Sequence, residues 1–359
     1  MSKKHYIIPI FVPHKGCPFD CIFCNQKKIT GLTKEITCQD VEMQIKEYLN
    51  TIPNLHENHV EIAFFGGSFT GIEINKQKEL LSIAATWKNK GIVKDIRIST
   101  RPDYIDPTIM KFLEGYGVSI IELGVQSMDI DVLMESGRGH TPDDVKNAVA
   151  LIRQFDIKLG LQMMIGLPKD NIEKINKSTE AIIALCPDFV RIYPTLVVRD
   201  TYLEKMYLEK QYRPLSLEEA ISISKNVFLK FLKHKIPVIR IGLQPTENIL
   251  LGREIITGPF HPAFRQLVES QIYKEMLQYL FIKYNIYNKK YIKLQGNPHN
   301  ISNLAGHKKT NIHFLRNTYK IEEIKIFKNN DLEDGEIKIL IPDGNEILYD
   351  MKEYAHNAI

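Results

Sequence analysis

The chain has 359 residues, of which 44% are hydrophobic and 25% are charged, and its formal net charge is +4. These proportions are ordinary for a folded domain and exclude a disordered or collagen-like chain. No stretch approaches the ~18 consecutive apolar residues of a membrane span, and the apolar run Tyr6–Val12 is too short for a signal peptide. Five cysteines, an odd number, suit a reducing compartment. We therefore expect a cytoplasmic protein with no membrane segment.

Strand-like runs alternate with amphipathic helical segments along the first 200 or so residues. The predicted strands are Tyr6–Val12, Val60–Phe65, Asp95–Ser99, Ser119–Val125, Leu159–Ile165 and Phe189–Tyr193. The predicted helices are Asp40–Leu49, Lys76–Trp87, Pro107–Tyr116, Pro142–Phe155 and Ile172–Leu185. Such alternation predicts an α/β fold with a parallel sheet. Six units are too few for a closed eight-stranded barrel, so we expect an open, partial (β/α)6 barrel of the TIM type.

Local start signals support several of these helices. Thr37 and Asp40 form a capping-box pattern, and Thr141 followed by Pro142 is a typical helix start. A further capping box at Ser216 predicts a helix to about Lys233, and residues 238–243 are strand-like.

The remainder of the chain is shorter and mixed in character. Residues 336–341 and 346–349 flank Pro342-Asp343-Gly344 and predict a terminal hairpin. We expect two domains, a barrel over residues 1–250 and a small α+β extension over residues 251–359 that is a candidate region for binding substrate or RNA.

Three cysteines lie close together near the N-terminus: Cys17, Cys21 and Cys24, in the spacing C-x3-C-x2-C. A loop this short can direct three thiolates at one point, which suits an iron–sulfur cluster or zinc. Structural zinc sites and electron-transfer clusters usually have four protein ligands. No downstream pair of cysteines or histidines completes a zinc site, so the pattern favours a cluster with one open iron.

Glycine and polar motifs follow the predicted strands at their carboxyl ends. Gly66 and Gly67 follow the second strand, Ser99 ends the third, Gln126 follows the fourth, and Gly166 follows the fifth. In β/α barrels the chemistry gathers at this edge. A turn also uses glycine and proline, so a single motif says little, whereas the repetition from strand to strand indicates a ligand site.

Phe23 precedes the third cysteine, and the resulting C-x3-C-x-aromatic-C run resembles the signature of the radical S-adenosylmethionine (SAM) superfamily. The resemblance implies a six-unit partial barrel and a [4Fe-4S] cluster on Cys17, Cys21 and Cys24. It further implies that SAM binds the open iron and is cleaved reductively to a 5′-deoxyadenosyl radical. An electron donor such as ferredoxin or flavodoxin is then also required.

The same resemblance implies the residues that bind SAM. The backbone of Gly66 and Gly67 would meet its amino group, and Arg138 would hold its carboxylate. Ser99 and Gln126 would bind the ribose hydroxyls, and Gly166 would flank the adenine. The sequence does not identify a residue that acts on the final substrate.

Five further segments resemble the Elongator catalytic-subunit type of radical SAM protein. They are residues 13–18, 65–70, 99–103, 122–127 with 138–140, and 258–264. We find no pyrophosphate-binding glycine loop of an acetyltransferase and expect the radical half of the family's chemistry alone. The resemblance implies tRNA modification. A radical SAM oxidoreductase on a small molecule such as a tetrapyrrole, similar to coproporphyrinogen oxidase, stays open, as does a cluster-bearing binding protein without catalysis.

Basic residues are concentrated late in the chain. Residues 283–328 contain ten Lys or Arg and two Glu, and Tyr284, Tyr287 and Tyr291 lie among the lysines. Basic side chains bind backbone phosphates, and aromatic rings stack on exposed bases, so this region is a candidate RNA surface. Ordinary lysine-rich surfaces and core tyrosines give the same pattern, and the sequence leaves both interpretations open.

Overall fold

The computed structural model describes residues 5–12, 21–25, 36–243, 250–342 and 344–358. The chain divides into two compact units. Unit 1 consists of Met1–Leu215 and Leu243–Phe260, and unit 2 consists of Ser216–Gly242 and His261–Ile359. The expected functional division at residue 250 stays a prediction.

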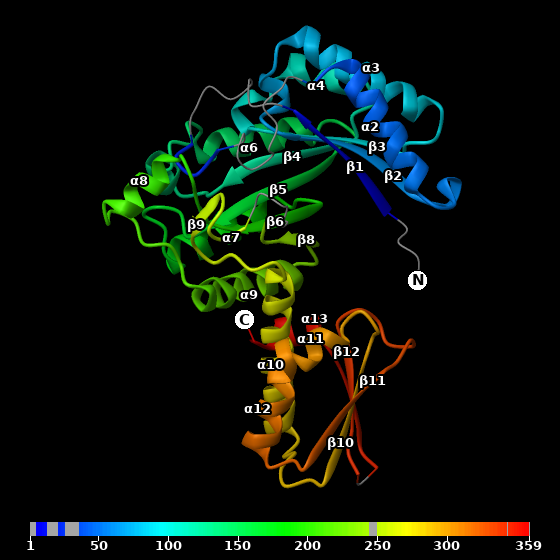
Figure 1. The fold of residues 1–359 in the computed structure, drawn as a ribbon, viewed down its shortest axis with the longest axis vertical. Coiled ribbons are helices and arrows are strands. Elements are labelled where there is room, and N and C mark those ends of the chain that lie inside the picture. Colours follow the sequence, from blue (N-terminus) through cyan, green and yellow to red (C-terminus); the bar gives the residue numbers. More distant parts are fainter. Residues whose placement is uncertain (1–4, 13–20, 26–35, 244–249, 343, 359) are drawn as a thin grey trace. The chain divides into compact units, whose positions relative to one another are not determined.

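A curled parallel sheet forms the centre of unit 1 (Figure 1). Six strands of this unit lie next to one another in chain order, with β1 at the edge of the sheet. Their bounds are β1 (His5–Val12), β2 (His59–Gly66), β3 (Asp95–Thr100), β4 (Ile120–Gln126), β5 (Lys158–Ile165) and β6 (Phe189–Pro194). The six predicted strands and the open, partial barrel are thus confirmed.

Helices connect the parallel strands, as parallel pairing requires. They are α2 (Cys38–Thr51), α3 (Ile74–Asn89), α4 (Pro107–Gly115), α5 (Ile130–Glu135), α6 (Pro142–Ile152) and α7 (Ile172–Ala184). Short 3-10 turns lie at Leu55–Glu57, Phe69–Gly71 and Pro102–Tyr104. The capping box predicted at Thr37 is present, and the helix predicted to start at Thr141 does so, there also with a capping box.

The two faces of the barrel sheet differ in chemistry because successive side chains point to opposite sides. One face is apolar and fully buried, with Ile62 and Phe64 on β2 and Ile96 and Ile98 on β3. The other face, the inside of the curled sheet, includes charged groups on β2, β3, β4 and β6. They are Glu61, Arg97, Glu122 and Arg191.

These four interior charges pair with one another. Arg97 Nε lies 2.5 Å from Glu61 Oε1, and Arg97 Nη1 donates to Glu122 Oε1. Arg191 Nη2 lies 2.9 Å from the same Glu122 oxygen. Glu61, Arg97 and Glu122 are at most 5% exposed, so each buried charge has the partner that burial demands. The sequence analysis did not predict this network.

The rest of unit 1 follows the sixth strand. Strand β7 (Val197–Val198) pairs antiparallel with β9 (Ile255–Thr257), and α8 (Tyr202–Leu208) lies between them in the chain. Ile22 of the cysteine segment packs in an apolar cluster with Val197, Leu203, Met206 and Tyr212. This packing anchors the turn between Cys21 and Cys24.

Unit 2 is a smaller α+β body, as the sequence predicts for the extension. Its four-stranded sheet has the order β11-β10-β12-β13, with β10 and β11 parallel and the β12–β13 pair antiparallel. The strands are β10 (Tyr291–Gly296), β11 (Glu323–Lys328), β12 (Glu336–Leu340) and β13 (Glu346–Asp350). The pairing of β12 with β13 confirms the predicted terminal hairpin.

A long helix, α10 (Phe264–Lys283), is the centre of unit 2. It packs against α9 (Leu217–Lys233), α11 (Ile301–Ala305), α12 (Thr310–Tyr319) and α13 (Met351–Ala358). Helix α9 begins with the capping box predicted at Ser216, and the short strand β8 (Val238–Ile241) follows it. Among the described residues no helix is long and apolar enough to cross a membrane.

Candidate cofactor site

The predicted site residues gather at the carboxyl edge of the barrel sheet. Gly66 and Gln126 are the last residues of β2 and β4, Ser99 is near the end of β3, and Gly166 follows β5. Cys21 and Cys24 lie in a short turn of the segment that follows β1, where the Cys24 amide donates to the Cys21 carbonyl over 2.9 Å. Cys17 and residues 13–16 lie outside the described residues.

Arg138 reaches the cysteine turn. Its guanidinium Nη1 donates to the sulfur of Cys21 at 3.3 Å, and Nη2 donates to the carbonyl of Gly124 at 2.6 Å. Arg138 is 7% exposed and Cys21 is 5% exposed, so a cation and a candidate metal ligand meet away from water. The structure therefore brings together two groups that lie 117 residues apart.

Local sequence explains how the arginine is presented. Asp129 caps α5, and the chain leaves that helix through Gly137 and Gly139, both at positive φ, on either side of Arg138. Glycine adopts this left-handed conformation without the steric cost of a Cβ. The Ile22 amide donates to the Ser136 carbonyl at 3.2 Å. This bond joins the backbone of residues 136–139, the arginine turn, directly to that of residues 21–24, the cysteine turn.

Arg101 holds the backbone of the arginine turn in place. Its side chain is 1% exposed, and Nη2 donates to the Arg138 carbonyl at 2.6 Å. Its Nε donates to Asp103 Oδ1 at 2.9 Å, which fixes the guanidinium in a two-pronged pair. Arg101 is thus a positioning residue for Arg138, a role that the sequence motif Ser99–Asp103 did not reveal.

Gln126 adopts an unusual backbone conformation at the end of β4. Its φ is +67°, and the pairing of β4 with β5 shifts between Gly124 and Gln126. A non-glycine residue in this region costs roughly 1 kcal/mol or more and persists where the surroundings enforce it, often at functional sites. The side chain is 5% exposed and accepts from Gln162 Nε2 at 3.4 Å, so it points toward the interior of the barrel.

Gly124 leaves space for the side chains of Arg138 and Gln126. The sequence analysis did not name Gly124 as a site residue. A Cβ at Gly124 would lie 2.7 Å from Arg138 Nη2 and 3.1 Å from Gln126 Nε2. Both distances are shorter than ordinary van der Waals contact, so any larger residue displaces one of the two side chains. A glycine inside an otherwise regular strand is the sequence signal that could have identified it.

His140 lies just beyond the arginine turn and is 2% exposed. Burial, together with the positive charges of Arg138 and Arg101, lowers the pKa of His140 to about 4. The imidazole is therefore neutral at physiological pH, and its Nε2 lies 3.2 Å from the Val125 carbonyl, where it serves as a donor. It connects the arginine turn to β4 without adding a third positive charge.

Two of the predicted glycines, Gly66 and Gly166, combine a positive φ with too little space for a Cβ. Gly66 has a φ of +109°, and a Cβ there would lie 2.5 Å from the Val12 carbonyl oxygen. Gly166 has a φ of +75°, and a Cβ there would meet Leu215 at 2.6 Å. The Gly166 amide donates to the half-buried Asp170, and desolvation raises the pKa of that carboxyl to about 6. The Gly166 carbonyl accepts from the Tyr212 hydroxyl. Both positions require glycine for the fold itself.

Two family models match the chain. The model described as Radical SAM superfamily matches residues 11–182, and the one described as Radical_SAM C-terminal domain matches residues 187–274. The chain belongs to the radical SAM superfamily. Membership makes it an enzyme and implies SAM and an iron–sulfur cluster as cofactors.

Relatives point to the Elongator type within this superfamily. An uncharacterized protein of Methanocaldococcus jannaschii is 29% identical over 249 residues, which is 67% of this chain and 75% of that protein. The tRNA uridine(34) acetyltransferase of Methanocaldococcus infernus is 26% identical over 263 residues, 63% of this chain and 49% of that protein. This radical SAM chain thus spans about half the length of that acetyltransferase.

The solved structure of Methanocaldococcus infernus Elp3 shares the fold. It matches with a TM-score of 0.60 and 22% identity, and the match covers 77% of this chain and 64% of that one. The expected resemblance to the radical SAM superfamily and its Elongator-type members is therefore confirmed.

The described residues fit the cofactors of a radical SAM enzyme. Cysteine thiolates are the usual ligands of iron–sulfur clusters, and neither Cys21 nor Cys24 is in a disulfide. Nε of buried Arg138 has no acceptor among the described residues. A buried cation with a spare donor suits an anionic ligand such as a carboxylate, and it lies against the sulfur of Cys21.

Proposed function

We propose that this enzyme uses a [4Fe-4S] cluster and SAM to modify tRNA by radical chemistry. The proposal rests above all on the contact between Arg138 and Cys21 at the carboxyl edge of the barrel. The names of the relatives that act on tRNA uridine(34) support the choice of tRNA. When bound, the reduced cluster supplies the electron that cleaves SAM and so provides a 5′-deoxyadenosyl radical.

In this proposal Cys17, Cys21 and Cys24 hold the cluster. Arg138 binds the carboxylate of SAM and keeps its cationic group beside the sulfur of Cys21. The positions of Arg101 and Gly124 support this role, because the first fixes the arginine turn and the second leaves room for the guanidinium. A pre-positioned arginine loses less conformational entropy when it binds a carboxylate.

The remaining SAM contacts in the proposal come from the ends of neighbouring strands. Gly66 and Gly67 meet the amino group, Ser99 and Gln126 bind the ribose, and Gly166 flanks the adenine. Two observations support these contacts. The side chain of Gln126 points into the barrel, and the absence of a Cβ at Gly66 and Gly166 lets a ligand approach the main chain closely.

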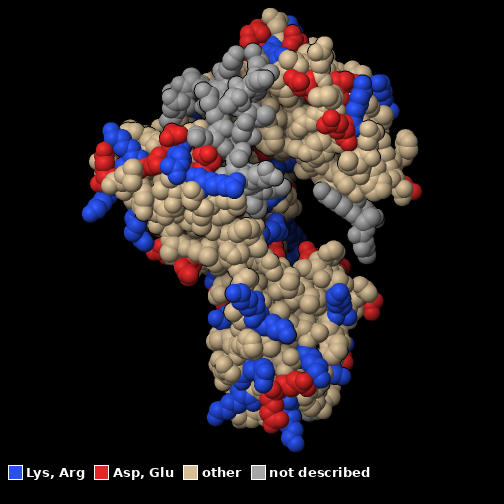
Figure 2. Space-filling model, in the orientation of Figure 1, with Lys and Arg blue, Asp and Glu red and all other residues tan. Residues whose placement is uncertain are grey.

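Unit 2 is the proposed RNA-binding part. Residues 276–321 contain eight Lys or Arg and no Asp or Glu. Seven of the eight side chains are exposed: Lys283, Lys290, Lys293, Lys308, Lys309, Arg316 and Lys320. Figure 2 shows Lys and Arg atoms at many points of the face of unit 2 that is turned to the viewer. A long segment without acidic groups attracts phosphates without local repulsion.

Aromatic rings lie beside several of these lysines. Lys283 Nζ lies 5.3 Å from the ring centre of Tyr279 and 5.6 Å from that of Tyr284, which is 46% exposed. Tyr287 is 40% exposed. Exposed rings beside cations are the components of a surface that stacks unpaired bases and holds their phosphates.

The catalytic half of the proposal is tested by anaerobic reconstitution followed by reduction with dithionite in place of a ferredoxin or flavodoxin. With SAM, the wild-type enzyme forms 5′-deoxyadenosine, measured by mass spectrometry. Cys21→Ala forms none, whereas Cys38→Ala, a control on α2, behaves as wild type. The proposal fails if the reconstituted wild-type enzyme forms no 5′-deoxyadenosine.

The RNA half is tested separately by filter binding of transcribed tRNA at increasing salt. We expect the triple variant K308Q/K309Q/R316Q to weaken binding and to flatten the salt dependence by about two to three phosphate contacts. The matched control K46Q/K146Q/K177Q changes three surface lysines of unit 1 and should leave both quantities unchanged. Equal behaviour of the two triple variants would exclude unit 2 as the RNA surface.

A further inference from the structure

Two histidines and two carboxylates meet at the amino edge of the barrel sheet, the edge opposite the candidate cofactor site. His5 at the start of β1 is paired in register with His59 at the start of β2, so both side chains lie on the same face. Their rings are 4.8 Å apart between centres and nearly perpendicular. Glu61 follows two residues after His59 on the same face, and Asp95 on β3 is its register partner.

The distances suit a shared ligand. The imidazoles and the Glu61 carboxylate each offer a donor atom, and these three atoms lie within 4.8 Å of one another. His5 Nε2 lies 3.1 Å from Glu61 Oε2, and His59 Nε2 lies 2.8 Å from Asp95 Oδ2. Ligands on one tetrahedral zinc, each at about 2.0–2.2 Å, are roughly 3.3 Å apart, so small side-chain rotations are sufficient.

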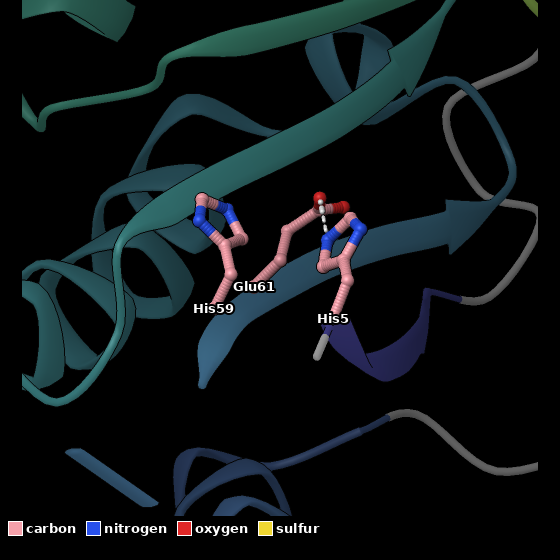
Figure 3. Close-up of side chains that lie close together, drawn as sticks. All are labelled: His5, His59 and Glu61. Carbon is pink, nitrogen blue, oxygen red and sulfur yellow. Dashed lines mark hydrogen bonds and ion pairs between the residues drawn. The ribbon is translucent and has the colours of Figure 1, made fainter. Parts of the chain in front are cut away.

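Figure 3 shows the three side chains His5, His59 and Glu61 rising on the same side of their strands. The two imidazoles flank the carboxylate, and the dashed line joins His5 to Glu61. The side chains of His5 and His59 are 50% and 42% exposed, whereas that of Glu61 is fully buried. An ion can therefore enter from solvent and meet a carboxylate that is already in place.

Arg97 and Ser119 hold the carboxylates of Glu61 and Asp95 in position. Arg97 Nη2 donates to Glu61 Oε2 at 2.9 Å, while Arg97 Nε forms an ion pair with Glu61 Oε1. Ser119 Oγ donates to Asp95 Oδ1 at 2.6 Å. Hydrogen bonds of this kind orient metal ligands and raise the affinity of a site. They leave the second oxygen of Asp95 and the outer side of Glu61 Oε2 directed at the imidazoles.

We propose that His5, His59 and Glu61, with Asp95 beside His59, form a binding site for a divalent transition metal, with zinc as the expected ion. Imidazole nitrogens together with carboxylate oxygens favour zinc, cobalt or nickel over calcium or magnesium. The site is structural, because the ~7 residues of β1 between His5 and Val12 put it roughly 23 Å from the cysteine end of the strand. It ties the edge strand β1 to β2 and β3.

The test is equilibrium dialysis of the anaerobically reconstituted full chain against Zn²⁺, with the bound metal counted by mass spectrometry. We expect one zinc per chain beyond the reconstituted iron, and a rise of the thermal midpoint with zinc. His5→Ala and His59→Ala should each weaken zinc binding at least tenfold and remove that rise. His234→Ala, an exposed histidine of unit 2, is the matched control and should change neither.

Two additional measurements keep the result unambiguous. Cobalt in place of zinc should give the weak absorption of nitrogen and oxygen ligands without the strong near-ultraviolet band of thiolate ligands, which separates this site from vacated cluster cysteines. His5→Gln and His59→Gln conserve side-chain size and serve where an alanine variant unfolds. The absence of stoichiometric zinc, or zinc binding that these histidine variants leave unchanged, would contradict the proposal. The histidines and carboxylates at the amino edge would then form only two hydrogen-bonded pairs.

Discussion

The two edges of the barrel sheet present functional groups by different means. At the carboxyl edge the backbone departs from regular geometry, with positive φ at Gly66, Gln126, Gly137 and Gly166. At the amino edge the backbone is regular, and the in-register pairing of β1, β2 and β3 aligns His5 with His59 and Glu61 with Asp95. The cofactor edge thus depends on main-chain approach, whereas the opposite edge depends on side-chain register.

This comparison predicts that the two edges of the sheet respond to different kinds of substitution. Substitutions that add a Cβ should damage the carboxyl edge, and substitutions that remove a donor atom should damage the amino edge. The buried ion pairs of Arg97 lie between the two, because Arg97 contacts Glu61 toward one edge and Glu122 toward the other.

The largest expected effect separates the two edges completely. Cys21→Ala should abolish both the iron content and the formation of 5′-deoxyadenosine, because the cluster loses one of three ligands. The double variant His5→Ala/His59→Ala should keep the rate of 5′-deoxyadenosine formation within twofold of wild type, since its residues lie at the other end of the strands. Loss of 5′-deoxyadenosine formation in a folded double variant would break the comparison.

The next effect concerns the interior that joins the edges. Arg97→Met leaves Glu61 and Glu122 short of a partner in the buried interior, and breaking a buried pair costs about 3–5 kcal/mol. We expect this loss in the free energy of unfolding measured by urea titration. Lys46→Met removes an exposed pair with Glu42 and is the control that should leave the urea midpoint nearly unchanged. Equal midpoints for both variants would contradict the network's role.

His140 tests the electrostatics of the carboxyl edge. Its folded pKa of about 4 lies below the ordinary value of 6.5, so the unfolded chain binds a proton first as the pH falls. The free energy of unfolding should therefore decrease as the pH drops from 6.5 toward 4, by about 2 kcal/mol at pH 5 from this group. His140→Gln should lose that part of the decrease between pH 7 and pH 5, measured by urea titration. An unchanged pH dependence would mean that His140 is not held neutral.

The smallest effect isolates a single Cβ. Gly124→Ala should push the Arg138 guanidinium out of place and raise the KM for SAM about tenfold, with little change in thermal midpoint. Gly115→Ala is the control, because a Cβ there meets nothing within 4 Å. A Gly124→Ala enzyme with unchanged KM would show that Arg138 does not depend on this gap.

Most of the fold of unit 1 was predictable because its signals are local. Alternating apolar runs located the six strands, and Thr37 and Thr141 began helices as their capping patterns predict, as did Ser216 in unit 2. The spacing of the cysteines was likewise readable, since three ligands from one short loop need no tertiary information.

The missed features depend on contacts between distant parts of the chain. Gly124 matters only because Arg138 folds back against it, and Arg101 acts through a carbonyl 37 residues away. The pairing of Glu61 with Arg97, and the approach of His5 to His59, arise from strand register, which no single segment encodes. Sequence reasoning identified the residues of the carboxyl edge but not the scaffold that positions them.

The most direct test of the central claim is the electron paramagnetic resonance spectrum of the reduced, reconstituted enzyme before and after addition of SAM. If three cysteines hold a cluster with one open iron beside Arg138, SAM changes the g-values in the wild-type enzyme, and Arg138→Ala needs a much higher SAM concentration for the same change. A cluster spectrum that SAM leaves unaltered in the wild-type enzyme would contradict the account.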